Sequence, residues 1–150
     1  MSEKDKKQGM DKPTQPSTGQ QTKVPDDSVD ILLEVLDLIP IPVTLYTSDL
    51  RLWNCNSVAK EVPWYPEGSR VRGSYLIDTN RYFAERGDFG EGDPAQLAED
   101  RIRPIMDQDY HFRDLELPNG VAARSSWYTL SDGSKLNLTI DMTDTVRRED

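Results

Sequence analysis

Two turn dipeptides, Asn119-Gly120 and Asp132-Gly133, constrain the fold of this chain more than any other sequence feature. Asn-Gly and Asp-Gly favour two-residue connections between antiparallel strands. They divide the last part of the sequence into three predicted strands, which begin near Tyr110 and continue over residues 121–130 and 135–142. We therefore expect three consecutive antiparallel strands at the C-terminal end of the fold.

The alternation of apolar residues changes phase within the first of these strands. Tyr110 and Phe112 share one face, whereas Leu115 and Leu117 share the other. An extra residue in a strand produces such a change, so the pattern predicts a β-bulge near Arg113-Asp114.

The last predicted strand has one apolar face and one polar face. Its apolar face carries Leu136, Leu138 and Ile140, and its polar face carries Asn137, Thr139 and Asp141. The pattern does not decide which face meets the helices, and both assignments stay open.

Two more strands and three helices are predicted before this region. The strands cover residues 43–47 and 50–53, with a turn at Ser48-Asp49. The first predicted helix is short, is capped by Asn54 or Asn56 and ends at Val62. The second covers residues 75–86, with Ser74 as its cap and Gly87 at its end. The third is capped by Asp93 and bends or ends before Pro104. Strands on both sides of a helical block indicate an α+β domain with one antiparallel sheet.

The N-terminal part divides into a polar tail and an amphipathic helix. Residues 1–25 are rich in Pro, Gln, Ser, Thr and Lys and are expected to be disordered. Asp26, Asp27 and Ser28 can cap a helix within residues 26–40, where the acids form one narrow stripe. This helix is either buried in its own fold or a contact surface for a dimer or partner; the candidate interface residues are Ile31, Leu32, Val35, Leu36 and Ile39.

Composition excludes several classes of function. The net charge of −9 disfavours binding to nucleic acid, since phosphates would be repelled. No secretory signal and no membrane-spanning segment is apparent, so we expect a cytoplasmic protein. One cysteine and one histidine leave no basis for a multi-cysteine metal site, and no catalytic motif is present.

Several segments resemble a known family. They are Leu50-Arg51-Leu52-Trp53-Asn54, the run from Ala84 through Glu85-Arg86-Gly87-Asp88-Phe89-Gly90-Glu91-Gly92 to Asp93, Leu117-Pro118-Asn119-Gly120, and Asp141-Met142-Thr143-Asp144. In this order they are similar to the bacterial PAS domains found in front of histidine kinases and diguanylate cyclases. The resemblance covers roughly residues 29–146, with the domain itself at 41–146 and a short end at 147–150.

This resemblance implies a PAS-like five-stranded antiparallel sheet with short helices on one face, and a sensor rather than an enzyme. Asp141 and Thr143 match the Asp-x-Thr motif through which such domains pass signals on. Since no output domain follows, we expect a stand-alone signalling module that acts through protein–protein contacts, as a homodimer or on a signalling partner. The alternative is a ligand-sensing domain cut from a larger kinase or cyclase.

The sequence does not decide whether the domain binds a small-molecule ligand, whereas haem and flavin are not expected. His111 falls on a predicted strand and Cys55 follows the second strand, which are not the positions that these cofactors use in the family. The candidate pocket residues are Tyr46, Trp53, Tyr75, Phe83, Arg113, Trp127 and Asn137; they are equally suited to an ordinary core.

Overall fold

The computed structural model describes residues 28–143. The expected tail at 1–25, the capping residues Asp26 and Asp27 and the end at 147–150 lie outside this range. The chain divides between Glu34 and Val35 into two compact units. Helix α2, Ser28–Asp37, spans this division, and none of its residues is buried.

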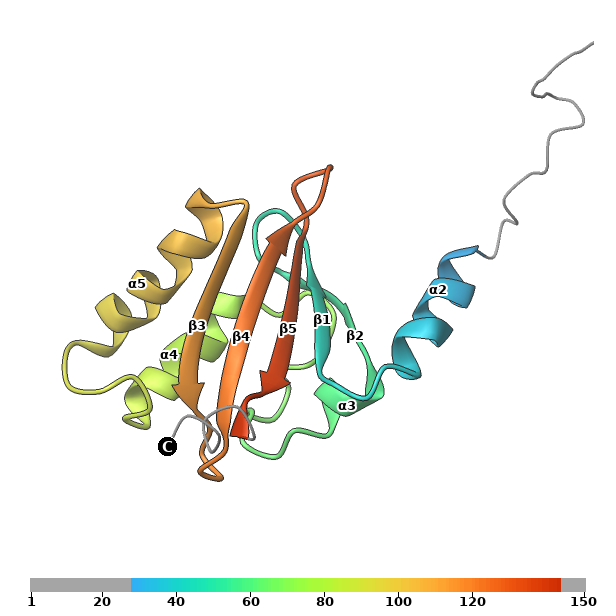
Figure 1. The fold of residues 1–150 in the computed structure, drawn as a ribbon. Coiled ribbons are helices and arrows are strands. Elements are labelled where there is room, and N and C mark those ends of the chain that lie inside the picture. Colours follow the sequence, from blue (N-terminus) through green and yellow to red (C-terminus); the bar gives the residue numbers. More distant parts are fainter. Residues whose placement is uncertain (1–27, 144–150) are drawn as a thin grey trace, which may run out of the picture. The chain divides into compact units, whose positions relative to one another are not determined.

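The five predicted strands form one antiparallel sheet. They are β1 (Val43–Tyr46), β2 (Leu52–Cys55), β3 (Tyr110–Glu116), β4 (Ala122–Thr129) and β5 (Lys135–Asp141), in the spatial order β2-β1-β5-β4-β3 (Figure 1). The last strand of the chain lies at the centre, between β1 and β4. The predicted sheet is therefore confirmed, and Trp53 and Trp127 belong to the same sheet.

The predicted bulge at Arg113-Asp114 is wrong. Strand β3 pairs with β4 in an unbroken register from Tyr110 opposite Tyr128 to Glu116 opposite Ala122. The phase change has another cause, because the strand carries apolar residues on both faces. Tyr110 and Phe112 lie exposed on the outer face, where the rings of Tyr110 and Tyr128 are 5.0 Å apart.

The two C-terminal hairpins have three-residue turns instead of the expected two-residue turns. In each hairpin, the N–H of the residue before the turn donates to the carbonyl of the residue four positions later. The carbonyl of the same residue accepts from the N–H of the residue three positions later. The third turn position is Gly120 in one hairpin and Gly133 in the other, with φ of 85° and 91°. This is a type I turn followed by a left-handed residue, a common three-residue hairpin loop.

The β1–β2 hairpin repeats this geometry with Leu50 in the glycine position. Thr47 N donates to Arg51 O at 2.8 Å, and Leu50 N donates to Thr47 O at 2.9 Å. Leu50 has φ of 63°, which costs a residue with a Cβ about 1–2 kcal/mol. Its side chain is only 4% exposed, and this burial offsets the backbone cost.

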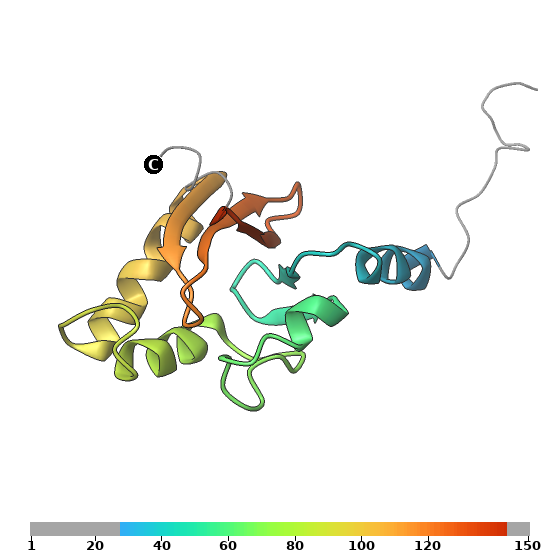
Figure 2. The ribbon, with the colours of Figure 1, turned by 60° about the horizontal axis from the view of Figure 1, so that its bottom comes forward.

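Three helices occupy the block between β2 and β3. They are α3 (Ser57–Lys60), α4 (Leu76–Glu85) and α5 (Pro94–Asp107), and Figure 2 shows α4 and α5 on one side of the sheet. Asn56 caps α3 and Asp93 caps α5, as predicted. Gly87, with φ of 93°, follows α4 as expected.

The predicted cap of α4 is wrong, and so is one of the two alternatives for α5, namely that it ends before Pro104. Ser74 does not cap α4, because its hydroxyl donates to Gly68 O and Val71 O in the preceding loop. Helix α5 does not end before Pro104 but continues to Asp107. The continuation places Ile105 in the core at 5% exposure. The free energy gained by burying this side chain outweighs the cost of the backbone hydrogen bond that Pro104 cannot donate.

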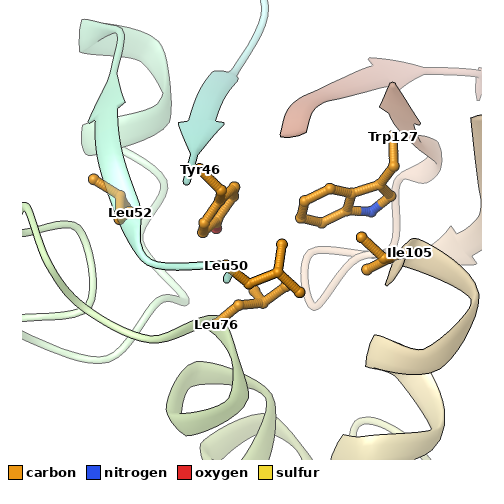
Figure 3. Close-up of a cluster of buried hydrophobic side chains, with 6 residues drawn as sticks. All are labelled: Tyr46, Leu50, Leu52, Leu76, Ile105 and Trp127. Atoms are coloured by element: carbon orange, nitrogen blue, oxygen red, sulfur yellow. The ribbon is translucent and has the colours of Figure 1, made fainter. Parts of the chain in front are cut away.

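The core lies between the sheet and these helices (Figure 3). The rings of Tyr46 and Trp127 face each other above Leu50, Leu76 and Ile105, which come from the β1–β2 turn, α4 and α5. Leu52 of β2 completes the buried cluster. Burying each of these side chains contributes roughly 1.5–3 kcal/mol to folding.

Candidate functional site

A cavity of about 390 Å³ lies between the sheet and helices α4 and α5. A smaller recess of about 240 Å³ adjoins it, and both are lined by Trp64, Tyr65, Leu117, Asn137 and Thr139. We call them the inner cavity and the side recess. The polar face of β5 lines both, so the apolar face of this strand lies on the outer side of the sheet.

Asn137 fixes the floor of the inner cavity at the centre of the sheet. The residue is 7% exposed, and its Nδ2 donates to Ser125 Oγ at 3.0 Å and to Ser126 O at 3.1 Å. Within residues 28–143 its Oδ1 has no recorded partner, so this oxygen can accept a hydrogen bond from a solute. Beside it, the rings of Tyr46 and Trp127 lie 5.3 Å apart.

The segment after α4, residues 86–92, forms one wall of the inner cavity. Arg86 pairs with Asp88 and also donates from Nη1 to Trp64 O at 2.8 Å, which ties this wall to the loop after α3. Phe89 packs edge-on against Phe83 at 6.2 Å, and both rings line the cavity. The family-like segment therefore has a structural role in shaping the cavity.

Two arginines and the histidine meet at this wall. Arg101 of α5 lies 4.1 Å above the Phe89 ring, and Arg113 and His111 come from the face of β3 that lines the cavity. Burial, and then the charge of Arg113, lowers the pKa of Arg101. The same two causes lower the pKa of His111. The second cause, which both groups share, indicates that the Arg113 guanidinium lies near both Arg101 and His111 at this end of the cavity.

A third arginine, Arg70, lines the side recess. Its guanidinium lies 4.3 Å above the Tyr65 ring, and its Nη2 donates to Thr44 Oγ1 at 2.5 Å. Its Nε is buried without a hydrogen-bond partner. Burial raises the pKa of Tyr46 to about 12, an effect that the nearby Arg70 charge partly opposes, so the Tyr46 hydroxyl stays protonated at neutral pH.

Five of the seven candidate pocket residues lie together around the inner cavity, namely Tyr46, Phe83, Arg113, Trp127 and Asn137. Trp53 and Tyr75 line neither the cavity nor the recess. They are 37% and 44% exposed, and each lies beneath an arginine, Arg72 at 5.8 Å and Arg51 at 5.1 Å. That any of the seven contacts a ligand remains a prediction.

Sequence reasoning missed several residues that line the site. Trp64, Tyr65 and Arg70 belong to an irregular loop, where no periodic pattern indicates which side chains point inward. Arg101 lies on α5, and the sequence pattern of that helix did not single it out. The one available signal was the aromatic pair Trp64-Tyr65, because large aromatic side chains in a loop are often buried.

The signal-motif candidates lie at the end of β5. The carboxylate of Asp141 accepts a hydrogen bond from Thr143 N at 2.8 Å, and Asp141 also lines the side recess. The hydroxyl of Thr143 is buried without a recorded partner. The path from the cavity to this motif is therefore short, because Asn137, Thr139 and Asp141 share one face of one strand.

Among residues 28–143, no three His, Cys, Asp or Glu side chains gather as metal ligands would. No helix in the same range is long and apolar enough to span a membrane.

The chain is similar in fold to several solved structures. The PAS domain of Bordetella pertussis BvgS is 17% identical, with a TM-score of 0.55, over 83% of this chain and 95% of that one. The phage VqmA–DPO complex is 15% identical, with the same TM-score, over 83% of this chain and 57% of that one. A C-terminal domain from Streptococcus mutans is 14% identical, with a TM-score of 0.51, over 81% of this chain and 90% of that one.

No curated protein sequence matches the chain significantly. A family profile described as PAS fold matches residues 36–150, which include the whole sheet, all three helices of the block and the inner cavity. The chain therefore belongs to the PAS-fold family, whose members are sensory modules of signalling proteins.

Proposed function

We propose that this protein senses a small molecule that binds in the inner cavity. The cavity carries this proposal, because its volume of about 390 Å³ lies within the range of small-molecule sites. Its lining also combines aromatic rings with a few polar groups, which is the composition that such sites use. The similar fold of VqmA, solved in complex with DPO, supports the same reading.

The position of β5 gives ligand binding a route to the end of the domain. Asn137 and Thr139 line the cavity, and Asp141 follows on the same face of the strand. A ligand that accepts or donates a hydrogen bond at Asn137 would change the position of the central strand. The strand would pass this change to Asp141 and its hydrogen bond with Thr143.

Two matched substitutions on β5 test this proposal. Thr139 lines both cavity and recess, whereas the next residue, Ile140, lies on the outer face and is 36% exposed. Thr139→Phe should fill the cavity, and Ile140→Phe should add the same ring outside it. The measurement is native mass spectrometry of the purified protein, followed by thermal-shift screening with a metabolite panel.

We expect a compound that stabilises the natural protein and Ile140→Phe but not Thr139→Phe. At a hundredfold excess over Kd the stabilisation should be about 2.7 kcal/mol. The proposal fails if no compound is retained and none raises Tm, or if the compounds found bind Thr139→Phe equally well.

A second candidate function is self-association through α2. The observation that favours it is that this helix has no buried residue, although it carries Ile31, Leu32, Val35 and Leu36. A second copy of the chain would cover these apolar residues, and Ile39 would extend the surface.

Sedimentation of the full chain tests this second candidate. Leu32→Asp and Leu36→Asp should convert a dimer into a monomer, whereas Glu34→Gln on the acidic stripe should leave it intact. A natural protein that sediments as a monomer at high concentration would contradict self-association.

A further inference from the structure

The inner cavity collects positive charge in a chain that is strongly acidic. The chain has a net charge of −9, with 27 acidic and 18 basic residues. Arg86, Arg103 and Arg124 each form an ion pair with an aspartate. No ion pair with a carboxylate of residues 28–143 is recorded for Arg101 or Arg113, the two arginines of the cavity.

The acids that line the cavity do not neutralise these two arginines. Asp88 is already held by Arg86, whose Nε donates to its Oδ2 at 3.0 Å. Glu116 is exposed on the opposite face of β3 from Arg113, since the two are an odd number of residues apart in a regular strand. Arg101 and Arg113 therefore repel each other without a compensating charge among the described residues, and they make no recorded hydrogen bond there.

Aromatic rings flank this positive end of the cavity. Phe89 lies directly below Arg101, Phe83 packs against Phe89, and Trp127 lies opposite His111 in the neighbouring strand. All five of these residues line the cavity. Guanidinium groups match the planar geometry of a carboxylate, and the rings offer flat apolar surfaces for stacking.

We propose that the ligand of the inner cavity is a small organic acid, with its carboxylate between Arg101 and Arg113 and a planar apolar body on the aromatic rings. This inference rests on the proposed function and specifies the chemical class of the molecule that is sensed. The carboxylate replaces the repulsion between the two arginines with two charge-assisted attractions.

Matched pairs of acids and neutral amides provide the test. The probes are benzoate with benzamide, and 2-naphthoate with 2-naphthamide, which differ mainly in charge. We expect each acid to raise Tm and its amide to leave Tm unchanged. Arg101→Gln and Arg113→Gln should each weaken acid binding at least tenfold, since each removes charge-assisted hydrogen bonds to the carboxylate. Arg103→Gln, on the same helix but paired with Asp100, should bind like the natural protein.

The stability of the free protein separates a ligand-binding role from a structural one. If Arg113 holds the fold together, Arg113→Gln should lower Tm without ligand. If Arg113 instead serves to bind an acid, Arg113→Gln removes its repulsion with Arg101. The Tm without ligand should then stay unchanged or rise, while acid binding is lost.

Amides that bind as well as the acids, acids that bind the glutamine variants equally well, or acids that raise no Tm would each overturn the acid assignment. In the first case, loss of amide binding in Thr139→Phe would show that the cavity is still a ligand site. Acids that bind Thr139→Phe undiminished would contradict both proposals.

Discussion

The rings of Tyr46 on β1 and Trp127 on β4 meet at 5.3 Å, although the central strand β5 separates their two strands. They lie opposite Lys135 and Asn137 of β5 on the face that carries the cavity. The same two side chains belong to the buried core and line the inner cavity. The floor of the candidate site is thus also part of what stabilises the fold.

Shortening Trp127 should therefore affect both stability and binding. Trp127→Ala should destabilise the protein by about 3–5 kcal/mol, because a large buried ring is lost and a void remains. Trp127→Phe should cost clearly less, because it keeps a ring against Tyr46. Urea denaturation of the two variants measures this difference. Equal stability of Trp127→Ala and the natural protein would show that this ring contact does not support the core.

Because Leu50 is left-handed, a glycine at this position should give a more stable protein than an alanine, which is the reverse of the usual order. Both Leu50→Ala and Leu50→Gly lose the buried side chain, but only glycine adopts a φ of 63° without strain. We expect Leu50→Gly to be more stable than Leu50→Ala by about 1 kcal/mol, from denaturant midpoints and m-values. An alanine variant that is the more stable one would contradict this account of the β1–β2 turn.

Asn56 joins three parts of the domain through its side chain. Its Oδ1 accepts from Val43 N and Ala59 N, and its Nδ2 donates to carbonyls of Leu36, Ile39 and Ile41. At 1% exposure, its removal leaves several buried backbone groups unsatisfied, so Asn56→Ala should cost at least about 3 kcal/mol.

Asn54 is the matched control for this measurement, because among residues 28–143 its Oδ1 accepts only the local N–H of Cys55. Asn54→Ala should cost less than about 1 kcal/mol. A similar loss of stability in the two variants would argue against Asn56 as the residue that organises this region.

His111 makes the stability of the domain depend on pH near neutrality. Burial and the Arg113 charge lower the pKa of His111 in the folded state below its ordinary value of 6.5. The unfolded chain therefore takes up a proton first, and the free energy of unfolding falls as pH falls from above 6.5 through the lowered folded pKa. His111→Gln should remove this contribution.

NMR can measure this pKa directly, because His111 is the only histidine of the chain. Its ring signal should titrate below pH 6.5 in the natural protein and at a higher pH in Arg113→Gln. A folded-state pKa at or above 6.5 would contradict the accumulation of positive charge at this end of the cavity.

The sequence predicted the elements of the fold better than their boundaries. Hydrophobic alternation and turn dipeptides located all five strands, since both signals are local. The same signals predicted a bulge that β3 does not have, because Tyr110 and Phe112 are exposed on the outer face. They also missed the continuation of α5, because the packing of Ile105 is a tertiary effect that a local rule about Pro104 does not include.

The candidate site was predicted only in part, for a related reason. Tyr46, Trp127 and Asn137 lie on regular strands, where alternation indicates which side chains share a face. Trp64 and Arg70 lie in a loop, and its path depends on contacts such as that of Arg86 with Trp64 O. Such long-range contacts leave no periodic pattern in the sequence.

The three tryptophans give the most direct test of the inner cavity as a ligand site. Trp64 and Trp127 line the cavity, whereas Trp53 lies outside it, 37% exposed. The indole N–H signals in a ¹⁵N NMR spectrum, assigned with Trp→Phe variants, can be followed while the best compound from the thermal screen is added. We predict that the signals of Trp64 and Trp127 shift and saturate together while that of Trp53 stays in place. Movement of the Trp53 signal with the other two unchanged would place the ligand elsewhere and contradict the account.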